Sequence, residues 1–478
     1  MTASPKKPQQ TSLYAEHCKV QPRRVDGRFR TLKWIATGIL LTIFFLGPWL
    51  RWSRGAGVPD QAILLDLAGR RGYFFSIEIW PQEVYYLTGI LILGAVGLFL
   101  ATSLWGRLWC GFTCIQTVFT DLFQWIEYRT EGDRSKRLSL DSGPWTSEKF
   151  TRKTIKIVLW LVVSFLTSAT FLLYFSDAFV TTMELLHGSA SSSFYSALFL
   201  IMASTFLLAG FAREQVCIYM CPWPRFQAAM VDEDSLIVTY EGWRGEPRGT
   251  HKRGQLFENR GHCIDCTMCV QVCPTGVDIR NGSQLACIGC ALCIDACDQV
   301  MDKIGLPRGL ISYDSSYNLA ARGKGTATRR RPIRPRTLMY TGVLLLVVAV
   351  MGGTLVTRSR LEVDVLHERS PLYVTMSNGA TRNGYTIKVL NMSREDQVYT
   401  LRTEGLPQAS VDIIGYTATA ATTVELPVKG DSVGTFRVYV TVPRGQLVNK
   451  TQELRFVLTE QRSGRSDSFP SIFAGSGE

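Results

Sequence analysis

Five stretches of about twenty mainly apolar residues constrain this 478-residue chain more than any other feature. A helix needs about 20 such residues to cross a bilayer core of roughly 30 Å. Lysine stands only at the edges of these stretches, as Lys33 and Lys156, so each stretch is predicted to be a transmembrane helix. The first is interpreted as a retained anchor, because no small-residue cleavage site follows it. The stretches are 32–50, 84–105, 155–175, 194–212 and 338–356.

Lysine and arginine are unevenly distributed among the connecting segments, and short segments rich in them stay in the cytoplasm. Three segments are rich in lysine and arginine: 1–31 contains seven of these residues, 106–154 contains eight and 322–336 contains seven. Two segments are poor in them: 51–83 contains four and 176–193 contains none. The N-terminal tail, the second loop and the segment 213–337 are therefore predicted to be cytoplasmic, and the C-terminal tail is predicted to lie outside. The net charge of +12 then reflects topology and contact with membrane lipid, and no nucleic acid is expected as a partner.

The region 358–478 has a different composition from the rest of the chain. Short runs such as "TFRVYVTVP" alternate polar and apolar residues at period two, and Gly, Pro, Asn and Asp separate them about every ten residues. This pattern predicts an all-β sandwich of the immunoglobulin type. No residues are placed for catalysis there, so we expect a docking or scaffolding role.

Eight of the thirteen cysteines form two runs with the spacing CxxCxxCxxxC. Such a loop wraps three thiolates around one 4Fe-4S cluster, while the fourth cysteine reaches the other cluster. Two tetrahedral zinc sites are the alternative, but these usually use two CxxC pairs with a longer spacer. The second run has Asp298 where the first has Pro274. The predicted ligands are Cys263, Cys266, Cys269 and Cys297 for the first cluster, and Cys287, Cys290, Cys293 and Cys273 for the second.

Four further cysteines, here called the membrane-edge cysteines, form two CxxxC pairs: Cys110 with Cys114, and Cys217 with Cys221. Each pair follows an apolar stretch at its predicted cytoplasmic end. If each helix continues through its pair, both sulfurs lie on one face, and four thiols can meet as a site for Cu(I), another thiophilic metal or dithiol chemistry. The alternative is that they are small apolar fillers.

The remaining cysteine, Cys18, lies beside His17 in the N-terminal tail. An accidental pairing is the simpler interpretation, with transient copper contact as the alternative.

Several segments resemble the cytochrome c oxidase accessory proteins of the CcoG family, also called FixG or RdxA. They include "GVPDQAILLDLAGRRGYFFSIEIWPQE", "LWCGFTC", "LAGFAREQVCIYMCPWPR" and "CIGCALCIDAC". The resemblance implies a bacterial inner-membrane protein that acts in assembly of cbb-type haem-copper oxidases, with cupric reduction as its chemistry. The first pair of the family usually reads CxxxCP, whereas Ile115 follows Cys114 here, which puts the local helix geometry in doubt.

Together these features predict a multi-domain α-helical integral membrane protein with five transmembrane helices. A bacterial-type ferredoxin domain with two 4Fe-4S clusters is inserted in it, and a C-terminal immunoglobulin-like sandwich follows. The predicted parts are a basic tail 1–31, a four-helix unit 32–212, a cytoplasmic segment 213–337 with the ferredoxin domain near 255–310, a fifth helix 338–357 and a periplasmic sandwich 358–478.

Three functions are compatible with this organisation. The first is reduction of Cu(II), as the substrate, for oxidase assembly, with oxidase subunits and copper-delivery proteins as partners and an unidentified cytoplasmic electron donor. The second is an electron-transfer subunit that exchanges electrons with quinone or a larger complex. This second interpretation is weaker, because no membrane helix contains a histidine that could bind haem b. The third is a non-enzymatic scaffold. The sequence contains no GxGxxG loop opening a helix for a nucleotide, and it leaves homo-oligomerisation open.

Overall fold

The structure of the chain is a computed structural model, and it divides into two compact units, residues 1–351 and 352–478. It describes residues 19–475 with the exception of a few short segments. These segments are 56–57, 251–256, 258–259, 358–360, 394, 407, 416–421, 431 and 448. Cys18 and His17 lie outside the described residues.

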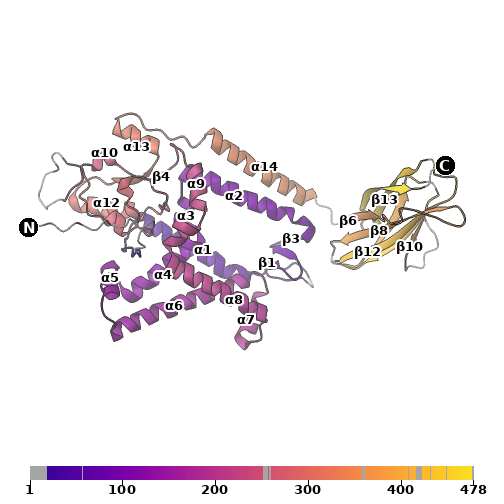
Figure 1. The fold of residues 1–478 in the computed structure, drawn as a ribbon, viewed down its shortest axis with the longest axis horizontal. Helices are drawn as coiled ribbons and strands as arrows, with labels where there is room; N and C mark the ends of the chain where they lie inside the picture. The colour runs from indigo at the N-terminus through magenta and orange to yellow at the C-terminus, as the bar shows by residue number, and fades with distance from the viewer. Residues whose placement is uncertain are drawn as a thin grey trace, which may run out of the picture. The chain divides into compact units, whose positions relative to one another are not determined.

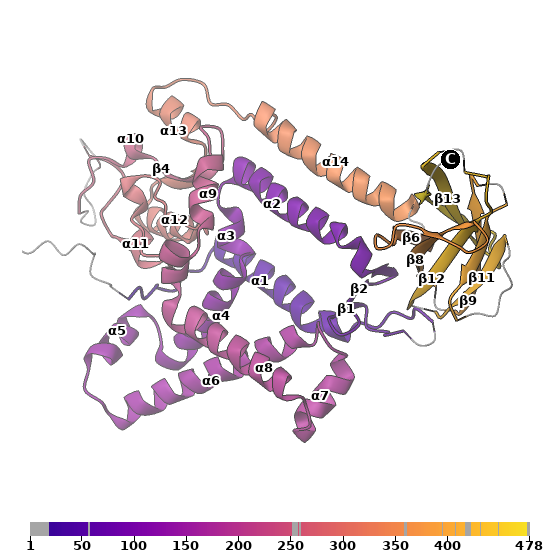
Figure 2. The ribbon, with the colours of Figure 1, turned by 45° about the vertical axis from the view of Figure 1, so that its right-hand side comes forward.

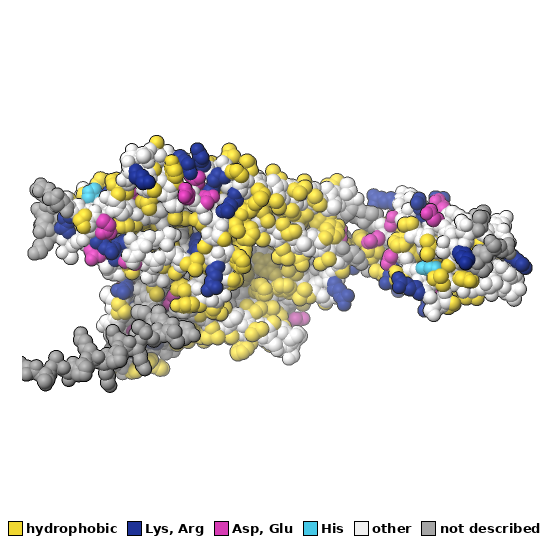
Figure 3. Space-filling model, turned by 45° about the horizontal axis from the view of Figure 1, so that its top comes forward, with side chains coloured by type: hydrophobic (Ala, Val, Ile, Leu, Met, Phe, Trp, Pro, Cys, Tyr) yellow, Lys and Arg dark blue, Asp and Glu magenta, His cyan; other side chains and the backbone are white. Residues whose placement is uncertain are grey.

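Five helices in the described residues are long and apolar enough to span a membrane, which confirms the sequence prediction (Figure 1). Apolar side chains such as Ile39, Leu91 and Leu200 point outward, as expected for lipid-facing positions. Figure 3 shows hydrophobic side chains gathered over this part of the surface. The spans are Arg28–Trp49 (α1 with the turn η1), Tyr85–Trp105 (α2), Ser147–Leu172 (α6), Ser192–Ala212 (α8 continued by the π-helix η3, Phe206–Ala212) and Pro335–Thr357 (α14).

Shorter elements lie at the two ends of these helices. At one end a small antiparallel sheet, β1-β2-β3, precedes α2, and α7 follows α6. At the other end α3, α4 and α5 follow α2, and η4 and α9 follow η3. Their bounds are β1 Ile63–Asp66, β2 Arg71–Phe74, β3 Ile77–Ile79, α7 Ala178–His187, α3 Leu108–Phe112, α4 Ile115–Glu131, α5 Arg134–Ser142, η4 Val216–Met220 and α9 Trp223–Met230.

The cysteine-rich part lies where α1 and α14 begin and α2 ends (Figure 2). Asp295 joins it to the membrane helices, because its carboxylate accepts the backbone N–H groups of Phe29 at 3.2 Å and Arg30 at 2.8 Å. A negative charge at the N-terminus of α1 satisfies free donors and complements the helix dipole. The elements are β4 Ile237–Tyr240, α10 Gly242–Gly245, α11 Met268–Gln271, η5 Ile279–Asn281, α12 Leu292–Ile304, β5 Ile311–Asp314 and α13 Ser316–Gly323.

The second unit is a β-sandwich of two antiparallel sheets, ordered β10-β12-β8-β6, with β7 on β8, and β11-β9-β13-β14. Alternate residues of its strands are buried, as in β11, and Tyr385, Leu426 and Phe456 are fully enclosed in its core. The period-two prediction is thereby confirmed. The strands are β6 Leu361–His367, β7 Val374–Thr375, β8 Thr381–Asn391, β9 Gln397–Glu404, β10 Ser410–Ile413, β11 Thr423–Val428, β12 Ser432–Val442, β13 Thr451–Glu460 and β14 Ser466–Ala474.

Candidate iron-sulfur and thiol centre

The eight cysteines of the two runs surround two small cavities. Cys263, Cys266, Cys269 and Cys297 line the first, and Cys273, Cys287, Cys290 and Cys293 line the second, which Cys269 also borders. Each cavity thus has three thiols from one run and the fourth cysteine of the other run. This grouping is the one that crossed ligation of two 4Fe-4S clusters requires, so the residues present fit the clusters.

The two cysteine loops share an unusual backbone conformation. Asp265 and Thr267 have φ of 53° and 55°, and the equivalent residues of the second run, Gly289 and Ala291, have φ of 69° and 59°. A left-handed conformation at a residue other than glycine is strained and persists only where the surroundings enforce it. The side chains differ but the loops wind alike, so each can wrap its three thiols around one centre.

Burial and nearby cations act in opposite directions on the thiols that line the two cavities. Burial raises the pKa of the Cys269 thiol to about 11 and that of Cys290 to about 12. Thiolates therefore need a positive partner in this environment, and binding of a metal centre releases protons. The Lys33 ammonium acts electrostatically on Cys290, and the Arg107 guanidinium acts on Cys287.

The membrane-edge cysteines do not lie on continuous helices, so the expectation of one helical face for each pair is wrong. Cys110 lies in α3 and Cys217 in the π-helical turn η4, whereas both second cysteines are extended. Cys114 has φ −60° and ψ 129°, and Cys221 has φ −80° and ψ 121°. Proline disfavours helical conformation in the preceding residue, which accounts for Cys221 before Pro222. Cys114 is the N-cap of α4 and has the same extended conformation as Cys221. Ile115 in place of proline therefore does not alter the backbone geometry of the second cysteine.

The structure nevertheless brings the two pairs together, and it places them against the second cavity. Cys110 and Cys217 pack on the buried cluster that contains Cys290. The Cys217 thiol is electrostatically coupled to Cys114, Cys110 and Cys221. Burial raises the pKa of Cys110 to about 11 and that of Cys217 to about 12, so both thiols are protonated at neutral pH without a metal.

No group of three or more His, Cys, Asp or Glu side chains converges on a single metal ion in the part of the chain that the structure describes. This result is expected for a 4Fe-4S cluster, because each cysteine binds a different iron atom. At the membrane edge it means that the four thiols do not form a closed site for one ion in this conformation.

Three residues that the cysteine pattern does not reveal hold the pairs against the ferredoxin loops. A Cβ atom on Gly111 would lie 2.9 Å from the backbone N of Cys290, so only glycine permits this approach. The Arg107 guanidinium donates to the carbonyls of Cys287 at 3.2 Å and Pro224 at 2.8 Å. The Cys110 thiol donates to Oε1 of the fully buried Gln227 at 3.2 Å.

One sequence signal could have identified a further residue of this centre. Lys33 is fully buried in the first apolar helix, where its ammonium lies 3.3 Å from Asp121. A charged residue inside a membrane helix is a functional candidate by default. In the sequence it stands at the edge of the stretch, and no role is predicted for it there.

The chain matches three protein families by sequence. Residues 212–316 match a family described as "4Fe-4S dicluster domain", and residues 87–138 match one described as "4Fe-4S binding domain". Residues 351–476 match the family described as "IG-like fold at C-terminal of FixG". The first match contains both cysteine runs and the second contains Cys110 and Cys114.

Whole proteins of known sequence are similar over nearly the entire chain. The Nitrogen fixation protein FixG of Rhizobium meliloti is 43% identical over 489 residues, with 96% of this chain and 93% of that protein covered. Protein RdxB of Cereibacter sphaeroides is 45% identical over 475 residues, with 98% of each covered. The crystal structure of a FixG-related protein from Vibrio parahaemolyticus is 21% identical, covering 25% of this chain and 98% of its own, with a TM-score of 0.21.

Proposed function

The chain belongs to the FixG/Rdx family of iron-sulfur membrane proteins, and on this premise we propose that it reduces Cu(II) to Cu(I) at the membrane-edge thiols for assembly of a haem-copper oxidase. Each Cu(II) takes up one electron. When bound, the two clusters supply electrons singly, which matches that requirement. Thiolates select Cu(I) over Cu(II), so binding of copper by these residues favours the reduced ion.

One observation carries the proposal: Cys110 and Cys217 pack directly against the residues around Cys290. A thiophilic substrate bound by these thiols would lie beside the residues proposed to hold the second cluster. Both thiols are partly buried, and Gln227 accepts a hydrogen bond from the Cys110 thiol, which holds its sulfur in position. The four thiols need not close around one ion, since a pair of thiolates suffices for Cu(I).

The proposal places the cysteine-rich part in the cytoplasm and the sandwich outside it, in a bacterial inner membrane. The excess of lysine and arginine in 106–154 and 322–336 supports this orientation. A cytoplasmic donor then supplies the electrons, and the sandwich is free to contact oxidase subunits or copper-delivery proteins. A reporter that is active only in the periplasm should be active after Glu478 and inactive after Gly323; the reverse pattern contradicts this orientation.

Crossed ligation is tested by Cys273→Ser. We expect this change to remove the cluster held with Cys287, Cys290 and Cys293, although Cys273 belongs to the other run. Iron analysis and electron paramagnetic resonance of anaerobically purified protein should show about half of the iron lost, with the signal of the cluster at Cys263 and Cys266 retained. Loss of that signal instead contradicts crossed ligation.

The activity itself is tested with full-length protein, reduced chemically under anaerobic conditions and freed of excess reductant. Addition of Cu(II) should reoxidise the clusters, seen in their visible absorption, and yield one Cu(I) per electron, measured with a Cu(I)-specific chelator. The proposal is contradicted if Cu(II) does not reoxidise the clusters, or if Cu(I) forms no faster than it does with the residual reductant alone.

A second candidate function, electron exchange with quinone, is favoured by a cavity of about 940 Å³. Leu104, Trp105 and Leu108 line it where α2 ends, and Ile294 and Tyr313 line it beside the second cysteine run. Its volume lies in the range of ligand sites. The same reduced protein should then be reoxidised by a short-chain quinone rather than by Cu(II), with two electrons and two protons taken up per quinone.

A further inference from the structure

A further cavity, separate from the two cysteine-lined cavities and from the one of about 940 Å³, is lined by several positively charged side chains. It has a volume of about 130 Å³ and lies between the N-terminal segment, α1, α4, α5 and the chain beside Cys273. One carboxylate, Asp26, is among its lining residues. The lining guanidinium groups are those of Arg23, Arg24, Arg30, Arg129 and Arg137.

Three of these arginines are held by aromatic side chains that also line the cavity. The guanidinium of Arg30 lies 4.6 Å from the ring centre of Trp34, and that of Arg24 lies 4.8 Å from the ring of Tyr128. Arg129 lies 5.3 Å from the ring of Trp125. Stacking fixes the planes of the guanidinium groups. Arg30 also donates to both carboxylate oxygens of Asp121 at 2.9 Å, and Arg24 donates to Asp26 at 3.3 Å, so only their remaining N–H groups can serve an anion.

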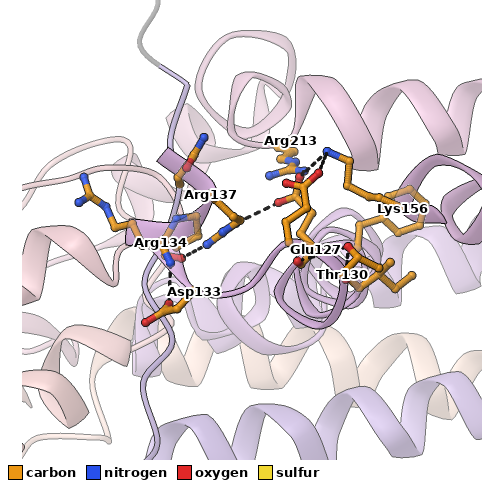
Figure 4. Close-up of polar contacts among 12 residues, drawn as sticks. Glu127, Thr130, Asp133, Arg134, Arg137, Lys156 and Arg213 are labelled. Carbon is orange, nitrogen blue, oxygen red and sulfur yellow. Dashed lines mark hydrogen bonds and ion pairs between the residues drawn. The ribbon is translucent and has the colours of Figure 1, made fainter. Parts of the chain in front are cut away.

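The carboxylates behind the cavity are shared among several cations. Figure 4 shows Glu127 between Arg137, Arg213 and Lys156, and the ion-pair distances are 3.0, 2.6 and 3.5 Å. Lys156 and Lys153 also pair with Glu131, and Lys153 pairs with Asp141. In these pairs of described residues, four cations thus share three carboxylates. Buried charge is costly unless it is compensated, so an excess of cations favours an anion nearby.

One donor of this network lacks a partner and belongs to a residue of the cavity wall. Arg137 is 3% exposed, its Nη1 donates to Glu127 at 3.0 Å and its Nη2 donates to the carbonyl of Pro22, but its Nε has no hydrogen-bond partner. An unsatisfied buried donor destabilises the folded state, more so when it is charged, unless a bound group accepts its hydrogen bond.

We propose that this cavity binds the phosphate group of a phosphate ester. Arginine binds phosphate through paired N–H donors, and the cavity brings five guanidinium groups together although Arg24, Arg30 and Arg137 each also have a carboxylate partner. Two sources supply this chemistry: the headgroup of an anionic phospholipid, since the cavity lies at the start of a membrane helix, or a soluble phosphate compound. Binding does not depend on the chemistry of the membrane-edge thiols.

The test compares full-length protein in detergent with the variant Arg24→Gln/Arg129→Gln. Both side chains lie at the cavity rim, and Arg129 has no described ion pair, so the fold should persist. The control Arg369→Gln/Arg437→Gln removes the same charge from exposed positions of the sandwich. Unchanged cluster absorption verifies folding in each protein, and Arg129→Gln alone serves if the double variant does not fold.

Two probes distinguish the sources of the phosphate. Native mass spectrometry after incorporation into bilayers of phosphatidylglycerol or phosphatidylcholine detects retained lipid, and calorimetry measures binding of inorganic phosphate. We expect wild type and control to bind at least one probe, and the double variant to bind it at least about tenfold more weakly, since it loses two groups that donate charged hydrogen bonds. Retention of phosphatidylglycerol alone assigns the site to lipid, and binding of phosphate alone assigns it to a soluble ester. Equal binding by wild type and double variant, or no binding of either probe by wild type, overturns the proposal.

Discussion

Replacing all four membrane-edge cysteines by serine will abolish Cu(II) reduction and leave the iron content at about eight atoms per chain. Serine is a hard ligand that does not select Cu(I), so the substrate loses its binding site. The eight cysteines around the two cavities are untouched, so the visible absorption of the clusters should persist. Iron analysis, absorption spectra and release of Cu(I) to a chelator give the three readings.

Partial variants divide the effect between the cysteines. Cys110→Ser/Cys217→Ser removes the thiols packed against the buried cluster that contains Cys290, and it should lower the rate nearly as far as the quadruple variant. Cys18→Ser is the matched control for loss of a thiol. Reduction of Cu(II) by the quadruple variant at the wild-type rate would show that these thiols are structural. A fall in iron content would instead assign them to a further iron-sulfur centre, as the family match over Cys110 and Cys114 would permit.

The parts of this fold that could be predicted from the sequence are those with a local code. Cysteine spacing determines which thiols a loop can wrap around one centre, and the grouping of Cys273 with Cys287 follows the predicted cross-over. The membrane helices are equally local signals, because bilayer thickness sets the length of each apolar stretch. The strands are recognised in the same way from the alternation of polar and apolar residues. Helix continuity at Cys110 and Cys217 was mispredicted, because i, i+4 spacing alone does not show that a helix ends.

The interactions that complete the site join residues far apart in the chain. Nothing in "LWCGFTC" indicates that Gly111 lies against Cys290, or that Arg107 binds the carbonyl of Cys287. Glu127 and Arg213 each look like ordinary charged residues of a loop, yet both are 2% exposed and lie 2.6 Å apart. Such pairs become visible only when α4, α6 and η3 are packed together.

The largest effect on stability is expected from Glu127→Gln. Its carboxylate faces three buried cations, and the amide leaves Arg213, Lys156 and Arg137 without their shared counter-charge. Removing one partner of a buried ion pair costs about 3–5 kcal/mol. The matched control is Glu148→Gln, because that side chain is 69% exposed and its ion pair among the described residues is with Arg152 on the same helix, an interaction of about 0–1 kcal/mol. Thermal denaturation in detergent, followed by circular dichroism, should show a large decrease in midpoint for the first variant and almost none for the control.

The pH dependence of this difference separates an ion pair from a packing effect. Burial opposes ionisation of Glu127, but Arg213, Lys156 and Arg137 outweigh it and lower its pKa to about 2. A carboxyl group with a lowered pKa stabilises the folded state above its unfolded value, near 4.5, and loses that contribution only as the pH falls toward 2. The stability difference between wild type and Glu127→Gln should therefore stay constant between about pH 5 and 8. A difference that titrates within this window would mean that Glu127 is not held ionised by the three cations.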